Sequence, residues 1–83
     1  MNSFMEIFRE VASTQPDGIV TVTEIVDCII AENGGSREYL ERKVRSHVRV
    51  LRTKGNLVAM KKRIPTVSGG TTLVDAYKEK AAR

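Results

Sequence analysis

Apolar residues recur three and four positions apart through the first two thirds of the chain, which predicts helices there. Ser3 and Glu6 have capping-box spacing at the start of the first stretch. "QPDG" at 15–18 is turn chemistry that ends it. We therefore expect a first helix over about 4–13. Its apolar stripe consists of Phe4, Ile7, Phe8 and Val11.

The same signals recur in the second helical stretch. Thr21 and Glu24 repeat the capping-box spacing, and Asn33-Gly34-Gly35 is a strong stop because glycine tolerates the left-handed conformation of a helix C-terminus. We expect a second helix over about 22–32. Its apolar face consists of Val22, Ile25, Val26, Ile29 and Ile30.

A third and longer helix follows the tight glycine turn. Ser36 is a suitable N-cap, and Gly55 ends a helical pattern that covers about 37–54. The apolar positions are spaced by four, four and three, so they share one sector of the helix. They are Leu40, Val44, Val48 and Leu51.

After Gly55 the period changes from that of a helix to that of a strand. "NLVAMKKRI" and "TTLVDAY" are short apolar or β-branched runs, and "PTVSGG" between them is rich in turn formers. The pattern predicts an antiparallel β-hairpin with strands at about 56–64 and 71–78. Ile19 and Val20 could add a short strand, and 79–83 is expected to be a frayed tail.

These elements define the expected fold class: α+β, mainly α, with a three-helix bundle and a C-terminal two-stranded β-hairpin. The 83 residues suit a single domain over 1–83. The lone Cys28 excludes an internal disulfide and fits a reducing compartment. The sequence begins without a signal-peptide pattern and has no apolar run long enough to span a membrane, so we expect a cytoplasmic protein.

The order helix, short strand, helix, glycine turn, longer helix and hairpin resembles the winged helix-turn-helix superfamily. The matching segments are "TVTEIVDCII", "VRVLRTKGNLV" and "LVDAY", and the resemblance covers about residues 3–78. It implies a third helix that enters a DNA major groove and a hairpin wing that contacts the backbone or the minor groove. Some members of the superfamily use the fold only for protein contacts, so fold alone does not settle function.

Charge is concentrated in the segment 36–63, which has ten Lys or Arg and only Glu38 and Glu41 as acids, a net charge of +8 within a chain of net charge +4. At about 100° per residue, Arg42 and Arg49 lie opposite the apolar sector of the third helix. Arg45 and Arg52 flank them on one side, with Ser46 and Thr53 on the other. Pairing of Glu38 with Arg42 and of Glu41 with Arg45 would make this an ordinary salt-bridged solvent face. Arg49 and Arg52 have no such partner.

We expect this face and the hairpin to bind duplex DNA, because guanidinium groups pair bidentately with guanine and phosphate. Cations in the hairpin could instead only block edge-to-edge aggregation. The residues expected to contact bases are Arg42, Arg45, Ser46 and Arg49. The residues expected to contact the backbone are Arg37, Arg52, Lys61, Lys62 and Arg63.

The expected function is a small double-stranded DNA-binding protein, a transcriptional regulator or an accessory factor. One such module covers few base pairs, so sequence-specific action is expected to need a homodimer or tandem copies on DNA. The alternative is a module that docks an acidic protein partner; RNA is disfavoured because exposed aromatic residues are scarce. We expect no enzyme activity, no metal and no cofactor. His47 and Cys28 are assigned to packing, His47 as a half-buried residue at the edge of the apolar sector, and Gly69-Gly70 to the hairpin turn.

Overall fold

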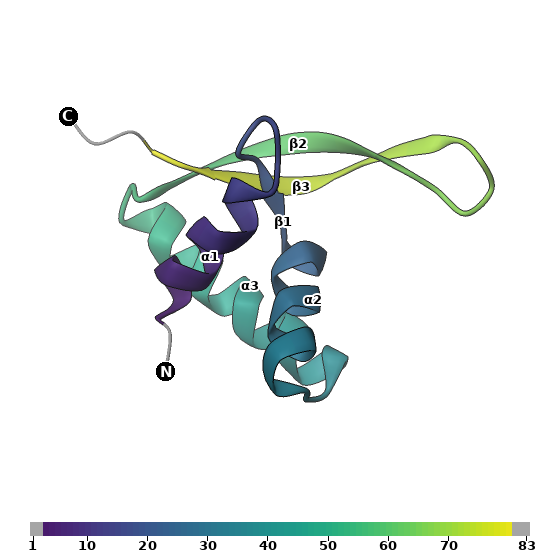
Figure 1. Ribbon diagram of the computed structural model, residues 1–83. Helices are drawn as coiled ribbons and strands as arrows, with labels where there is room; N and C mark the ends of the chain where they lie inside the picture. The colour runs from purple at the N-terminus through teal and green to yellow at the C-terminus, as the bar shows by residue number, and fades with distance from the viewer. Residues whose placement is uncertain (1–2, 81–83) are drawn as a thin grey trace.

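A computed structural model describes residues 3–80 of the protein, which form three helices and one three-stranded antiparallel sheet. The helices pack together on one side of a long hairpin, and the far end of this hairpin projects beyond them (Figure 1). No helix among the described residues is long and apolar enough to cross a membrane. The elements are α1 (Phe4–Ser13), β1 (Val20–Thr21), α2 (Val22–Asn33), α3 (Arg37–Thr53), β2 (Leu57–Pro65) and β3 (Thr71–Glu79).

Local capping chemistry sets the helix boundaries, and the predicted ranges are confirmed to within one residue. Both capping boxes form: the Ser3 hydroxyl accepts a bond from the Glu6 N–H, and the Thr21 hydroxyl accepts one from the Glu24 N–H. The Ser36 hydroxyl serves α3 in the same way. These side chains satisfy backbone donors that the first turn of a helix leaves without partners.

The predicted count of two strands is wrong, because Val20 and Thr21 form a third strand. Val20 pairs with Tyr77 and Thr21 with Ala76, so β3 lies in the centre of a sheet with the order β1-β3-β2. A two-residue strand has too little sequence pattern to be identified by periodicity, and its partner lies more than fifty residues away in the chain. The observed arrangement is compatible with a winged-helix-like fold.

The hydrophobic core lies where the three helices meet the base of the hairpin. Each of these elements contributes aliphatic or aromatic side chains that are almost fully buried, and no buried side-chain nitrogen or oxygen among the described residues lacks a hydrogen-bond partner. The core therefore joins the sheet and the helices into one packed unit. Its members are Phe8, Val11, Val20, Ile25, Val26, Val44, Val48 and Leu57.

The C-terminal end of β3 is attached more firmly than a frayed tail would be. Glu79 belongs to the strand, and its carboxylate accepts bonds from Nε and Nη2 of Arg9, the closest at 2.8 Å. The Lys80 N–H donates to the carbonyl of Asn56. The predicted tail therefore begins later than residue 79, and 81–83 lie outside the described residues.

We predict that Val48→Asp destabilises the protein strongly, because Val48 is 2% exposed and a carboxylate there would be buried without a partner. The melting temperature should fall by about 12–24 °C, which corresponds to a loss of about 3 kcal/mol. Val50→Asp is the matched control, since Val50 lies on the same helix but is 51% exposed. Circular dichroism melts of the two variants check this assignment; equal melting temperatures would contradict it.

Candidate nucleic-acid interface

Helix α3 carries different chemistry on each of its three sides. One side holds the buried Val44 and Val48. A second side, here called the arginine face, consists of Arg42, Arg45, Arg49 and Arg52, which are all exposed. This face follows from the helical period alone, because steps of three and four residues keep these positions within one sector.

A hollow of about 360 Å³ lies between the arginine face and the hairpin. Arg45, Arg49 and Arg52 line it on the helix side, and the first residues of α2, Thr21–Thr23, close one end. The positive end of the α2 dipole therefore adds to the charge of the guanidinium groups. The hairpin contributes the opposite wall, through Ile64, Val74, Asp75 and Tyr77.

Few carboxylates neutralise the arginine face. Arg45 lies 3.8 Å from Glu41, a long ion pair with the predicted spacing of four. Among residues 3–80, no ion pair joins Glu38 to Arg42, and none involves Arg49 or Arg52. A solvent face neutralised by its own salt bridges therefore does not account for most of these arginines.

The three consecutive hairpin cations divide between the two faces of the sheet, as strand alternation requires. Lys61 donates a hydrogen bond to the carboxylate of Asp75, which lowers the pKa of Asp75, and the charge of Arg52 lowers it further. Leu57 and Tyr77, which share the face of Lys61 and Asp75, pack in the helical core, so Lys61 lies on the helix side of the hairpin. Arg63, two residues after Lys61, lies on the same face of the strand and donates a hydrogen bond to the Thr71 hydroxyl at 3.0 Å. Lys62 points to the other face.

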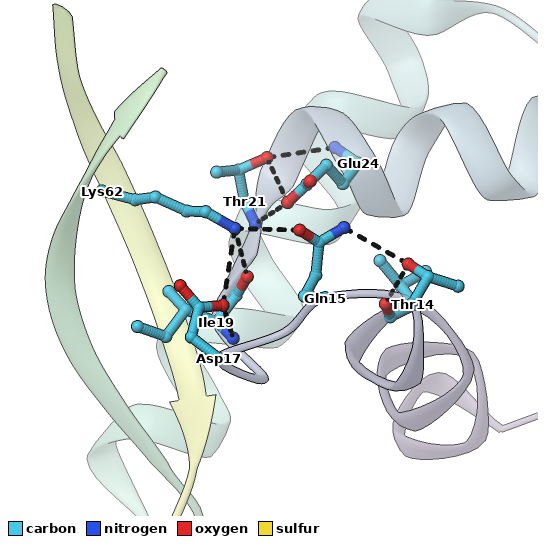
Figure 2. A network of polar contacts seen from close by, with 8 residues as sticks. Thr14, Gln15, Asp17, Ile19, Thr21, Glu24 and Lys62 are labelled. Carbon is cyan, nitrogen blue, oxygen red and sulfur yellow. Dashed lines mark hydrogen bonds and ion pairs between the residues drawn. The ribbon is translucent and has the colours of Figure 1, made fainter.

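Lys62 connects the hairpin to the loop between α1 and β1 (Figure 2). Its ammonium group donates to the carbonyl of Ile19 at 2.8 Å and to Oε1 of Gln15 at 3.0 Å, and lies 3.7 Å from Asp17. The Ile19 N–H and then the charge of Lys62 lower the pKa of Asp17. The Lys62 side chain is only 18% exposed. It holds the fold together at a place where we had expected a DNA contact.

The remaining predicted residues also differ in their surroundings. Arg37 forms an ion pair with Asp27 of α2, so its guanidinium is already engaged. Ser46 lies next to Tyr39, Arg42 and Lys43 in a shallow hollow on the outer side of α3. The loop of the hairpin, 66–70, contains no cation. The basic residues at 61–63 lie within β2, as the predicted strand range requires, and the tip beyond them is uncharged.

The third side of α3 combines apolar and basic residues beside the start of α1. It borders a hollow of about 550 Å³ whose lining includes Val50, Lys43 and Lys54 from α3, and Phe4 and Met5 from α1. The His47 ring, predicted to be half-buried, is exposed and stacks on that of Phe4 with centroids 5.1 Å apart. The apolar spacing of the helix does not predict this surface, although the apolar Val50 visibly lies outside that spacing.

Glu10, Cys28 and Glu32 come together between α1 and α2, with their ligand atoms within 4.8 Å of one another. Burial and the two nearby carboxylates raise the pKa of the Cys28 thiol, and Glu10 raises the pKa of Glu32. A protonated thiol is a poor metal ligand. The i, i+4 spacing of Cys28 and Glu32 was visible in the sequence, whereas the approach of Glu10 requires the tertiary fold.

We predict that Lys62→Met destabilises the fold, because the hydrogen bonds to Ile19 and Gln15 are lost at a poorly exposed site. The free energy of unfolding should fall by about 1–3 kcal/mol, as for other bonds to charged groups. Lys61→Met makes the same chemical change on the exposed face and should have little effect. Urea denaturation compares the two variants; equal stabilities would refute a structural role for Lys62.

Comparisons with protein-family models, with curated proteins and with solved structures find no match for the chain. The functional argument therefore depends on the positions, charges and contacts of the residues described above.

Proposed function

We propose that the protein is a double-stranded DNA-binding protein of the winged-helix type, with α3 in the major groove and the hairpin on the adjacent backbone. Transcriptional regulation or an accessory role in DNA transactions would follow from such binding. DNA is a polyanion whose phosphates supply most of the binding free energy to basic proteins. The support comes from the distribution of charge over α3 and the hairpin.

One observation carries the proposal: three residues of the arginine face line a hollow whose opposite wall is the hairpin that also carries Lys61 and Arg63. Arg49 and Arg52 line it from the helix, and Asp75, which lines it from the hairpin, is paired with Lys61. Two basic elements on either side of a hollow can contact phosphates along one backbone while α3 occupies the groove. Such a surface is complementary to a long duplex with regularly spaced phosphate charges.

The structure narrows the set of residues we propose as contacts. Arg42, Ser46 and Arg49 lie farthest from the core and are assigned to base edges. Arg45 and Arg52, which line the hollow together with Arg49 but lie closer to the apolar side of α3, are assigned to phosphates or adjacent bases. On the hairpin, Lys61 and Arg63 face α3 and are assigned to the backbone, whereas Lys62 is assigned to the fold. Arg37 and Lys61 contribute only if DNA displaces their pairing with Asp27 and Asp75.

We predict that Arg49→Ala weakens DNA binding by about 1–3 kcal/mol without changing the melting temperature. The slope of log affinity against log salt should be about −4 to −6 for the parent and smaller in magnitude by about 1 for the variant. Fluorescence anisotropy with a labelled random-sequence duplex measures both quantities at several salt concentrations.

Arg9→Ala is the control, because it removes the same charge from a residue that pairs with Glu79. Its affinity and salt slope should match those of the parent. If Arg49→Ala and Arg9→Ala have equal effects, only net charge matters and the groove arrangement is wrong. Absence of binding by the parent protein at low salt would refute DNA binding itself.

A second candidate function, docking of an acidic protein segment, is favoured by the hollow beside Val50. Apolar side chains form its floor and Lys43 and Lys54 are part of its lining. An amphipathic helix with carboxylates beside an apolar anchor would complement both features. If Val50→Asp abolishes biological activity in cells while leaving DNA affinity unchanged, this function is supported over DNA binding alone.

A further inference from the structure

The distal end of the β2–β3 hairpin is chemically unlike the rest of the hairpin. It projects beyond the helices (Figure 1), and its loop, Thr66–Gly70, contains no charged residue. Val67 in this loop is fully exposed. Leu73, close to the loop on β3, is 53% exposed. An aliphatic side chain thus occupies the most protruding part of a basic hairpin.

Backbone hydrogen bonds close the loop around Val67. The Thr66 N–H donates to the Gly70 carbonyl at 2.9 Å, and the Gly69 N–H donates to the Thr66 carbonyl at 3.1 Å. Gly69 has a φ of 92°, which L side chains rarely adopt, so the tight closure depends on glycine there. The loop therefore presents Val67 in a defined position at the apex.

Single exposed apolar residues are common on protein surfaces and need no explanation by themselves. Val67 differs from the exposed Val50 and Val58 because it lies in the loop at the far end of the hairpin. Its neighbours in the loop are small and uncharged, so no charged side chain of the loop would contact a partner at the same point. The cations Lys61 and Arg63 precede it on the same hairpin, on the side that faces α3.

The spacing between Arg63 and Val67 fits the dimensions of a DNA groove. Arg63 is two residues from the end of β2 at Pro65, or about 7 Å at the usual strand rise of about 3.3 Å per residue, and the loop adds further reach. The minor groove of B-DNA is about 7.5 Å deep. With Arg63 on a phosphate at the rim of the groove, Val67 reaches the base edges at its floor.

We propose that Val67 acts as a wedge that enters the minor groove, partly unstacks a base step and bends the duplex. This inference rests on the proposed DNA binding and adds a mechanical activity to it. Two strands lie about 4.8 Å apart before their side chains are counted, whereas the minor groove is only about 6 Å wide. Entry of the hairpin therefore opens the groove, which bends DNA toward the major groove.

The wedge also predicts where the protein prefers to bind. Pyrimidine–purine steps unstack at lower cost than others, so they favour a kink. The uncharged hydroxyl-bearing residues of the loop, Thr66 and Ser68, can contact the acceptor atoms that A·T pairs present in the minor groove. The preferred sites are accordingly A·T-rich segments that contain TA steps.

The test is energy transfer between dyes at the two ends of a duplex of about 30 base pairs with a central TA step, measured at saturating protein. The parent protein should raise the transfer efficiency. Val67→Ser should raise it by less than half as much, with an affinity within about threefold by anisotropy, since the backbone contacts remain. Val67→Leu, which keeps an apolar wedge, should bend the duplex as the parent does.

Val58→Ser is the matched control, because it makes the same chemical change at an exposed valine of β2 outside the loop, and it should bend the duplex as the parent does. Equal transfer by the parent and by Val67→Ser would overturn the proposal, as would binding by the parent without any increase in transfer. If the parent fails to bind the duplex in the anisotropy measurement, DNA binding itself fails. The two readouts therefore separate failure of the wedge from failure of the function on which it rests.

Discussion

The pairing of Val20 and Thr21 with the centre of the hairpin is the constraint on which the rest of the arrangement depends. Thr21 is bonded to the sheet through Ala76 and is also the N-cap of α2. One buried residue thus belongs to the sheet and fixes the start of a helix. Because α2 packs on α3, this connection sets the angle at which the hairpin stands relative to the arginine face. The hollow between them exists as a consequence.

Lys62 adds a second connection on the opposite face of the hairpin. A half-buried ammonium group is costly unless acceptors surround it, and here a backbone carbonyl, an amide oxygen and a carboxylate do so. The cost of burial therefore supports its structural assignment, because a lysine used mainly for a flexible phosphate contact would remain in solvent. In the middle of β2, Lys62 is therefore committed to the fold on one face, whereas Lys61 and Arg63 remain exposed on the other.

The helices and the arginine face could be predicted from sequence because their determinants are local. Capping boxes, glycine stops and a period of 3.6 residues act within a few positions of one another. The pairing of the short strand β1 with β3 and the role of Lys62 could not, because the partners lie more than forty residues away. Strand alternation alone could predict that Lys61 and Arg63 lie on one face and Lys62 on the other, once the direction of one of these side chains was known. The uncharged tip was also visible in the sequence, because "PTVSGG" between the two predicted strands contains no charged residue.

Strand alternation has a consequence for changes in chain length. Inserting one residue between Met60 and Lys61, or deleting Met60, would exchange the two faces of the hairpin for the residues that follow. Lys61 after the insertion, or Arg63 after the deletion, would then occupy the position beside Ile19, and the other cations would reverse their orientation relative to α3. A length change of two residues would preserve the faces and alter only the reach of the hairpin. The protein should therefore tolerate paired insertions in this strand far better than single ones, even though a single insertion adds no charge and removes none.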